Sequence, residues 1–188
     1  MKTRINYYEQ LSADYSRPGL VSQEIGDKLI KDAQEYISLR EESLPEITPE
    51  YNLAQIEKEN RDWWSTHCEA LRRGRGDILA DEYANNLVYL CSDGPFYGKA
   101  SGTEREANWW AIIAQPGVTM TWPLVMFSGE AVYFEWNCMD EETNEVIAKG
   151  NVTWLRRGHR GACYLKCEQL TFYRDVFAPT QLLELIKR

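Results

Sequence analysis

The chain has 188 residues, of which 44% are hydrophobic and 12% aromatic, and a formal net charge of −8. This length suits one domain, or one domain with an extension, and can bury a core without disulfide staples. The negative charge disfavours nucleic acid and anionic membranes as partners. The five cysteines include no C-x-x-C pair, which argues against a zinc site or a disulfide framework and favours buried, reduced thiols.

The first residues, MKTRINYYEQ, lack the apolar segment of a signal peptide, and no apolar run is long enough to span a membrane. We therefore expect a cytoplasmic protein. Residues 1–20 are polar and are interpreted as a loosely attached arm. Residues 22–40 carry apolar side chains at helical spacing, which predicts a helix.

A second helix is predicted to begin at the second of the two prolines in SLPEITPE, residues 43–50. Thr48 is its predicted N-cap and Pro49 its first helical residue, and the basic, glycine-containing segment 72–76 ends it. The apolar face of this helix is expected to carry Leu53, Ile56, Asn60, Trp63, Trp64, His67 and Leu71.

The rest of the chain predicts mainly strands. A short helix at 77–83 and a strand at 87–91 come first, and a capping box formed by Thr103 and Glu106 predicts the start of another helix. Pro123 indicates a bulge or an edge strand. Long antiparallel strands joined by hairpin turns are predicted at 118–127, 131–139, 146–157 and 161–177. This order predicts an α+β fold, with helices packed on one side of a strongly curved sheet.

Motifs for nucleotide cofactors and metals are missing from the sequence. The glycines of CSDGPFYGK, residues 91–99, fit neither the P-loop nor the dinucleotide-binding spacing. There is no G-x-S-x-G and no H-E-x-x-H, and the two histidines are far apart. We expect a protein that uses no cofactor and no metal.

Three segments together suggest a family: GDILADEYANNLVYL (76–90), DGPFYG (93–98) and FYRDVFAPTQLLELI (172–186). Over residues 51–188 the chain resembles the SnoaL-like branch of the NTF2-like superfamily, and residues 1–50 are left as an N-terminal helical extension. The resemblance implies a strongly curved mixed or antiparallel sheet wrapped around helices, a cone with a deep pocket. In this cone DGPFYG is the turn after the first strand. Phe96 and Tyr97 either cover the mouth of the pocket or only pack within that turn.

Strand alternation sorts the side chains that would face such a pocket. On the strand at 161–177, Lys166, Glu168 and Arg174 are expected to face solvent. Glu135 is ambiguous: it is a candidate base if its face points inward and a surface carboxylate if it points outward. The residues expected to face inward are Trp154, Arg156, Gln169, Tyr173 and Asp175.

Acid–base chemistry needs titratable groups in that pocket. His67 lies near the position where related isomerases place a helix tyrosine, whereas His159 is expected in an exposed turn. The face of the first strand that carries an acid in ketosteroid isomerases has Cys91 here, which argues against that exact activity. The catalytic candidates are His67, Tyr89, Glu135 and Asp175, and His67 and Asp175 are equally well explained as structural residues. The candidates for substrate binding are Trp63, Tyr97, Trp110, Trp154, Arg156 and Tyr173.

The resemblance implies a cofactor-independent lyase or isomerase that moves protons on a small apolar, aromatic substrate. Phenolic and lignin-derived compounds, with dehydration or a retro-aldol cleavage that releases formaldehyde, fit this expectation. Two alternatives remain open at the level of sequence: a non-catalytic subunit of an oligomeric oxygenase, and a small-molecule binding module. We also expect a homodimer or a higher homo-oligomer.

Overall fold

The structure is a computed structural model that describes residues 22–37, 44–91, 94–113, 117–158 and 162–172. The elements follow one another as α2 (Gln23–Ile37), α3 (Leu53–Arg72), α4 (Gly76–Asp81), β1 (Tyr83–Cys91), β2 (Gly94–Tyr97), α5 (Gly98–Ile113), β3 (Val118–Ser128), β4 (Ala131–Asp140), β5 (Val146–Arg156) and β6 (Cys163–Phe172). None of the helices in these ranges is long and apolar enough to cross a membrane.

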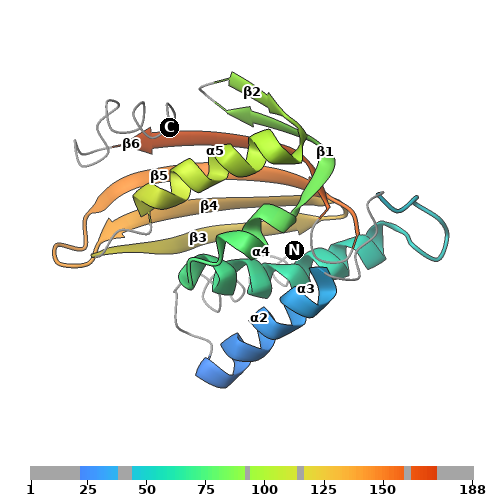
Figure 1. The fold of residues 1–188 in the computed structure, drawn as a ribbon, viewed down its shortest axis with the longest axis horizontal. Coiled ribbons are helices and arrows are strands. Elements are labelled where there is room, and N and C mark those ends of the chain that lie inside the picture. Colours follow the sequence, from blue (N-terminus) through green and yellow to red (C-terminus); the bar gives the residue numbers. More distant parts are fainter. Residues whose placement is uncertain (1–21, 38–43, 92–93, 114–116, 159–161, 173–188) are drawn as a thin grey trace, which may run out of the picture.

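One six-stranded sheet organises the fold, in the order β2-β1-β6-β5-β4-β3. β1 and β6 are parallel, and the other neighbours are antiparallel, so the sheet is mixed. Helices α3, α4 and α5 lie against one face of it (Figure 1). The predicted α+β class is confirmed. The strong curvature is not found, because β3 to β6 run side by side as a gently bent sheet (Figure 1).

Helix α3 has the expected buried face but a different start. Asn52 is its N-cap: its Oδ1 accepts hydrogen bonds from the backbone N–H groups of Ala54 and Gln55, at 3.1 and 3.2 Å. The predicted cap, Thr48, instead accepts a hydrogen bond from the backbone N–H of Tyr51 in the preceding turn. Leu53 is consequently the first helical residue and is 53% exposed rather than part of the core.

The segment after β1 also differs from the prediction. β1 and the short strand β2 form a tight hairpin in which Cys91 pairs with Gly94, so the expected turn contains a strand. Helix α5 begins at Gly98, whose φ of 83° suits glycine. Thr103 therefore lies inside the helix and the predicted capping box is wrong.

The strands at 118–172 agree well with the sequence pattern. β3 is an edge strand, and its register with β4 shifts between Thr121 and Leu124, so Pro123 marks both an edge and an irregularity. The inner face of this sheet and the inner face of α3 enclose the core. Its largest fully buried side chains include Trp63, Trp64, Trp122, Trp136 and Trp154.

Helix α2, from the predicted N-terminal extension, packs against α3. Arg73, which follows α3, forms an ion pair with Asp27 of α2 at 2.6 Å. Further along, the backbone oxygen of Pro45 accepts a hydrogen bond from Arg157 at 3.2 Å. The described part of the extension therefore lies on the domain.

Candidate functional site

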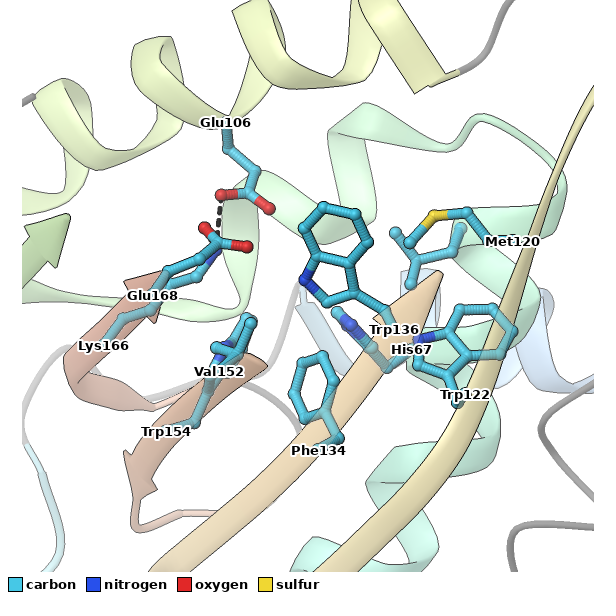
Figure 2. Close-up of a pocket in the computed structure, with 11 residues that line it drawn as sticks. His67, Glu106, Met120, Trp122, Phe134, Trp136, Val152, Trp154, Lys166 and Glu168 are labelled. Atoms are coloured by element: carbon cyan, nitrogen blue, oxygen red, sulfur yellow. Dashed lines mark hydrogen bonds and ion pairs between the residues drawn. The ribbon is translucent and has the colours of Figure 1, made fainter. Parts of the chain in front are cut away.

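A small cavity lies between helices α3 and α5 and the inner face of the sheet (Figure 2). Its volume is about 20 Å³, which suffices for about one water molecule. Pockets that hold organic ligands typically measure about 300–1,000 Å³. Among the described residues this cavity is therefore not the deep pocket that the resemblance implied, because large side chains fill the space between α3 and the sheet.

The cavity walls are mostly aromatic. Trp122, Phe134, Trp136 and Trp154 line it from β3, β4 and β5. The indole N–H groups of Trp122 and Trp154 are buried and have no hydrogen-bond partner among the described residues. A buried N–H group without an acceptor is costly, so a water or ligand oxygen beside these two rings would be stabilising.

A cluster of charged side chains forms another wall. Figure 2 shows Glu106 reaching from α5 toward Lys166 and Glu168 on β6. Nζ of Lys166 lies 2.6 Å from Oε2 of Glu106 and 3.3 Å from Oε2 of Glu168. Glu168 also accepts a hydrogen bond from the hydroxyl of Tyr89, and Lys166 lies 4.5 Å from the centre of the Tyr89 ring. Lys166, Glu168 and Tyr89 are each no more than 5% exposed.

The surroundings of Lys166 decide what its amine can do. Burial alone would lower the pKa of Lys166, but the neighbouring carboxylates of Glu106 and Glu168 more than reverse this and raise it. The side chain is consequently a fixed ammonium group at neutral pH and not a nucleophilic amine. Burial, together with Glu168, also raises the pKa of Tyr89 well above its usual value, so this phenol keeps its proton.

His67 lines the cavity from α3 and is 4% exposed. Its Nδ1 atom lies 2.7 Å from Oε2 of Glu82, and the other oxygen of Glu82 accepts a hydrogen bond from the indole of Trp63 at 2.8 Å. The imidazole is 5.2 Å from the ring of Trp154, centre to centre. His67 and Trp154 are thus the predicted site residues that border the cavity.

Two predicted binding residues lie behind the cavity rather than in its wall. Arg156 is fully buried, its guanidinium carbon lies 3.7 Å from the centre of the Trp63 ring, and its Nη1 donates to Oδ1 of Asn60 at 2.8 Å. Burial lowers the pKa of Arg156 to about 10. Neither Trp63 nor Arg156 lines the cavity.

Other candidates point away from it. On β4 the buried face carries Phe134 and Trp136, so Glu135 lies on the opposite face, where it accepts a hydrogen bond from Tyr133 at 3.1 Å. The outward alternative for Glu135 is the one found. Tyr97 is 67% exposed on β2 and does not line the cavity.

On β6 the predicted inner and outer faces are exchanged. Lys166 and Glu168 are buried, whereas Gln169 is exposed. The pairing of β5 with β6 is also irregular: Leu155 pairs with Leu165, but the next residue, Arg156, pairs with Cys163. One extra residue in β6 changes which residues of the alternation face the core.

Three further residues of the sequence analysis lie beyond the part of the chain that the structure describes. Tyr173, Asp175 and His159 lie outside the described residues. Trp110 belongs to α5, but its side chain also lies outside the described part.

The sequence analysis did not place Glu106, Lys166 and Glu168 in the charged wall of the cavity, nor Glu82 behind it as the partner of His67. One signal for Lys166 and Glu168 was available, because they interrupt an otherwise largely uncharged stretch of strand. Charged residues within such a stretch are expected either on a solvated face or in a buried, paired cluster. Nothing in the sequence chooses between these possibilities.

No protein-family model matches the sequence, and no curated protein is similar enough in sequence to count as a match. In structure the chain is similar to an NTF2-like protein of unknown function from Mesorhizobium loti, with a TM-score of 0.48 and 12% identity over 61% of this chain and 93% of that chain. It is also similar to a steroid delta-isomerase from Pseudomonas aeruginosa, with a TM-score of 0.47 and 16% identity over 78% of this chain and 94% of that one.

A third similar structure is a protein of the SnoaL-like family from Agrobacterium tumefaciens, with a TM-score of 0.42 and 14% identity over 53% of this chain and 82% of that chain. The SnoaL-like and NTF2-like names of these structures agree with the resemblance read from the sequence. All three TM-scores are below 0.5, so what this chain does has to be argued from its own site.

Proposed function

We propose that this chain is an enzyme that needs no cofactor, an isomerase or lyase that transfers a proton on a small, largely apolar, aromatic substrate. One observation carries the proposal. An imidazole and a carboxylate-paired ammonium group border the same small, aromatic-walled cavity. Buried titratable groups gathered at one cavity are typical of acid–base catalysis.

Each group has a distinct role in the proposed reaction. His67 is the base that removes a proton from a C–H or O–H bond of the substrate. The ammonium group of Lys166 stabilises the negative charge that then develops on a substrate oxygen. The indole N–H groups of Trp122 and Trp154, which have no acceptor in the described part of the chain, are further donors for that oxygen. A positioned acid or base typically contributes about 10²–10⁴-fold in rate.

Tyr89 has a supporting role in this scheme. Its hydroxyl donates to Glu168, and Tyr89 is not among the residues that line the cavity. It therefore orients the Glu168 carboxylate instead of touching the substrate. Asp175, the remaining catalytic candidate, stays a prediction.

The size of the cavity limits the substrate. A cavity of about 20 Å³ is smaller than an aromatic ring, so binding requires side chains or helix α5 to move. A single-ring substrate needs less movement than a two-ring, lignin-derived compound. We therefore favour a single-ring phenol or aryl carbonyl compound.

The test is deuterium incorporation without added cofactor. The protein is incubated in D₂O with a panel of single-ring aryl ketones, hydroxy ketones and phenols, and ¹H NMR follows C–H exchange and product formation. We expect exchange or turnover with one class of compound, and none with heat-denatured protein. If no compound of the panel exchanges faster than in buffer, the proposal is wrong.

The filled interior favours a second candidate, a non-catalytic protein such as an oxygenase subunit. In that case the buried charges would serve only to hold α5 on the sheet. Tryptophan fluorescence with the same panel separates the two candidates, because Trp122, Trp136 and Trp154 surround the cavity. Saturable quenching together with exchange supports the enzyme. The absence of both responses supports the non-catalytic protein.

A further inference from the structure

Glu82 is held in position by hydrogen bonds of both its backbone and its side chain. It directly follows α4, its backbone N–H donates to the carbonyl of Leu79 at 3.2 Å, and its carbonyl accepts from the N–H of Cys163 at 3.0 Å. Its two carboxylate oxygens face Trp63 and His67, which are four residues apart on α3. The side chain is buried, with 3% exposure. Glu82 has little freedom to turn away from either ring.

These contacts fix which atoms carry hydrogen. The indole nitrogen of Trp63 can only donate, so Oε1 of Glu82 must accept. An ionised Oε2 likewise only accepts, and opposite such an oxygen, at 2.7 Å, Nδ1 of His67 is the donor. In an imidazole that carries a single hydrogen, this arrangement puts the hydrogen on Nδ1 and leaves the lone pair on Nε2.

The charge of Glu82 is balanced without His67. Arg156 is fully buried and lies over the ring of Trp63, which itself binds Glu82. Burial lowers the pKa of Arg156 to about 10, and Glu82 is the leading charge that opposes this lowering. Because Arg156 supplies the counter-charge, the hydrogen bond from Nδ1 does not require a charged imidazole.

The Nε2 side of the His67 ring is the side that is left to face the cavity. Glu82 does not line the cavity, whereas His67 does, so Nε2 is the ring nitrogen left for it. Aromatic rings surround the imidazole: Trp63 at 4.7 Å, Trp64 at 5.6 Å and Trp154 at 5.2 Å, centre to centre. They restrict rotation of the ring and offer it no competing acceptor.

We propose that Glu82 is a positioning residue which, together with Trp63, holds His67 in the Nδ1–H tautomer and leaves Nε2 as the proton acceptor in the cavity. This rests on the proposed function in taking His67 as the base. In the reaction, Nε2 takes a proton from the substrate, and the Glu82 carboxylate stabilises the imidazolium that forms. Glu82 does not touch the substrate itself.

The tautomer can be measured without any substrate. Two-dimensional ¹H–¹⁵N NMR of the uniformly labelled protein distinguishes a protonated ring nitrogen from an unprotonated one. The chain has only two histidines, so a His159→Gln variant assigns the signals of His67. Between pH 7 and 8 we expect hydrogen on Nδ1 and a free Nε2. Hydrogen on Nε2 in the wild-type protein would overturn the proposal, whether or not any variant folds.

Glu82→Gln is the decisive variant. Its amide oxygen must accept from Trp63, so its NH₂ group faces Nδ1 of His67 and donates to it. We expect the tautomer to reverse, with hydrogen on Nε2. For a substrate found in the deuterium assay, we expect kcat to fall roughly 10²-fold or more with KM little changed. A Glu82→Gln protein that keeps hydrogen on Nδ1 contradicts the proposal.

Two controls separate positioning from general damage. Glu69→Gln changes a buried carboxylate on the same helix, and Glu69 binds Arg72 and Arg73 rather than His67, so the tautomer should not change. Glu82→Asp keeps an acceptor and should retain the Nδ1–H tautomer. A reversed tautomer in either control would contradict the proposed role of Glu82. If the wild-type tautomer is as expected but nothing is turned over, the proposed function fails and the tautomer assignment stands.

Discussion

Nζ of Lys166 lies 2.6 Å from Oε2 of Glu106, and this ion pair joins β6 to α5 inside the protein. The side chains of Lys166 and Glu106 are 2% and 13% exposed. Removing one partner of a buried ion pair typically costs about 3–5 kcal/mol, because the other charge is left buried alone. Here the loss of Lys166 would leave both Glu106 and Glu168 without their ammonium partner.

We therefore expect Lys166→Met to lower the free energy of unfolding by about 3–5 kcal/mol in urea titrations. Lys28→Met is the matched control, since Lys28 forms an exposed pair with Asp32 within α2 and should cost less than about 1 kcal/mol. Adding Glu106→Gln to Lys166→Met should restore part of the loss. Equal effects of Lys166→Met and Lys28→Met would show that the buried cluster is not structural.

Glu69 gives a prediction about pH. Burial alone would raise the pKa of Glu69, but hydrogen bonds from Arg72 and Arg73 outweigh burial and lower it. A carboxylate whose pKa is lower in the folded protein stabilises it above the unfolded pKa of about 4.3, and this stabilisation is lost as the pH falls through the folded value.

Glu69→Gln should therefore cost about 1.5–3 kcal/mol at pH 7, the usual contribution of hydrogen bonds to a charged group. The difference in the free energy of unfolding between wild type and variant should shrink as the pH falls below about 4.3. Urea unfolding at pH 7, 5, 4 and 3 measures it. A difference that stays constant over this range would mean that the ionised carboxylate is not the source of the stabilisation.

Gly150 on β5 allows close packing beside the cavity. A Cβ atom there would lie 2.5 Å from the backbone oxygen of Gln169 and 2.5 Å from Cζ2 of Trp136. Both distances are too short, so we expect Gly150→Ala to cost about 1–3 kcal/mol and to shift Trp136, which changes the tryptophan emission. Gly76→Ala is the control, because a Cβ at Gly76 meets nothing within 4 Å. If both variants have the same midpoint of thermal unfolding, a Cβ atom at residue 150 is tolerated and the argument from close packing is wrong.

Asn60 supports the buried guanidinium of Arg156. Its Oδ1 accepts from Arg156 at 2.8 Å, and its Nδ2 donates to the carbonyl of Gly129 at 3.0 Å. We expect Asn60→Ala to cost about 1–3 kcal/mol, since it leaves a buried charged donor unpaired. Asn86→Ala, at an exposed position of β1, should change stability by less than about 0.5 kcal/mol. Differential scanning calorimetry compares the two, and a loss for Asn60→Ala no larger than that for Asn86→Ala would argue against this role.

The sequence predicted those parts of the fold that depend on regular repetition. The face of α3 with Trp63 and His67 repeats at helical spacing, and the strands from Val118 onward follow long β-rich runs. Helix starts were less predictable, because Thr48 and Asn52 are both good capping residues and only the tertiary structure selects Asn52.

The site was predictable only in part, for a similar reason. His67 and Trp154 were found because their elements are regular. Lys166 and Glu168 were assigned to the wrong face because charged residues on a strand usually lie on its solvated face, whereas these two belong to a buried, paired cluster. Glu82 binds His67, which is 15 residues away in the sequence, and Glu106 binds Lys166, which is 60 residues away. No local sequence pattern predicts such pairs.

The central claim is that His67 transfers a proton in the cavity. The most direct measurement compares kcat and KM of wild type, His67→Gln and His159→Gln, with a substrate found by deuterium incorporation. We expect His67→Gln to lower kcat by about 10²–10⁴-fold with KM within a few-fold of wild type, and His159→Gln to change neither. An unchanged kcat in His67→Gln would contradict the account.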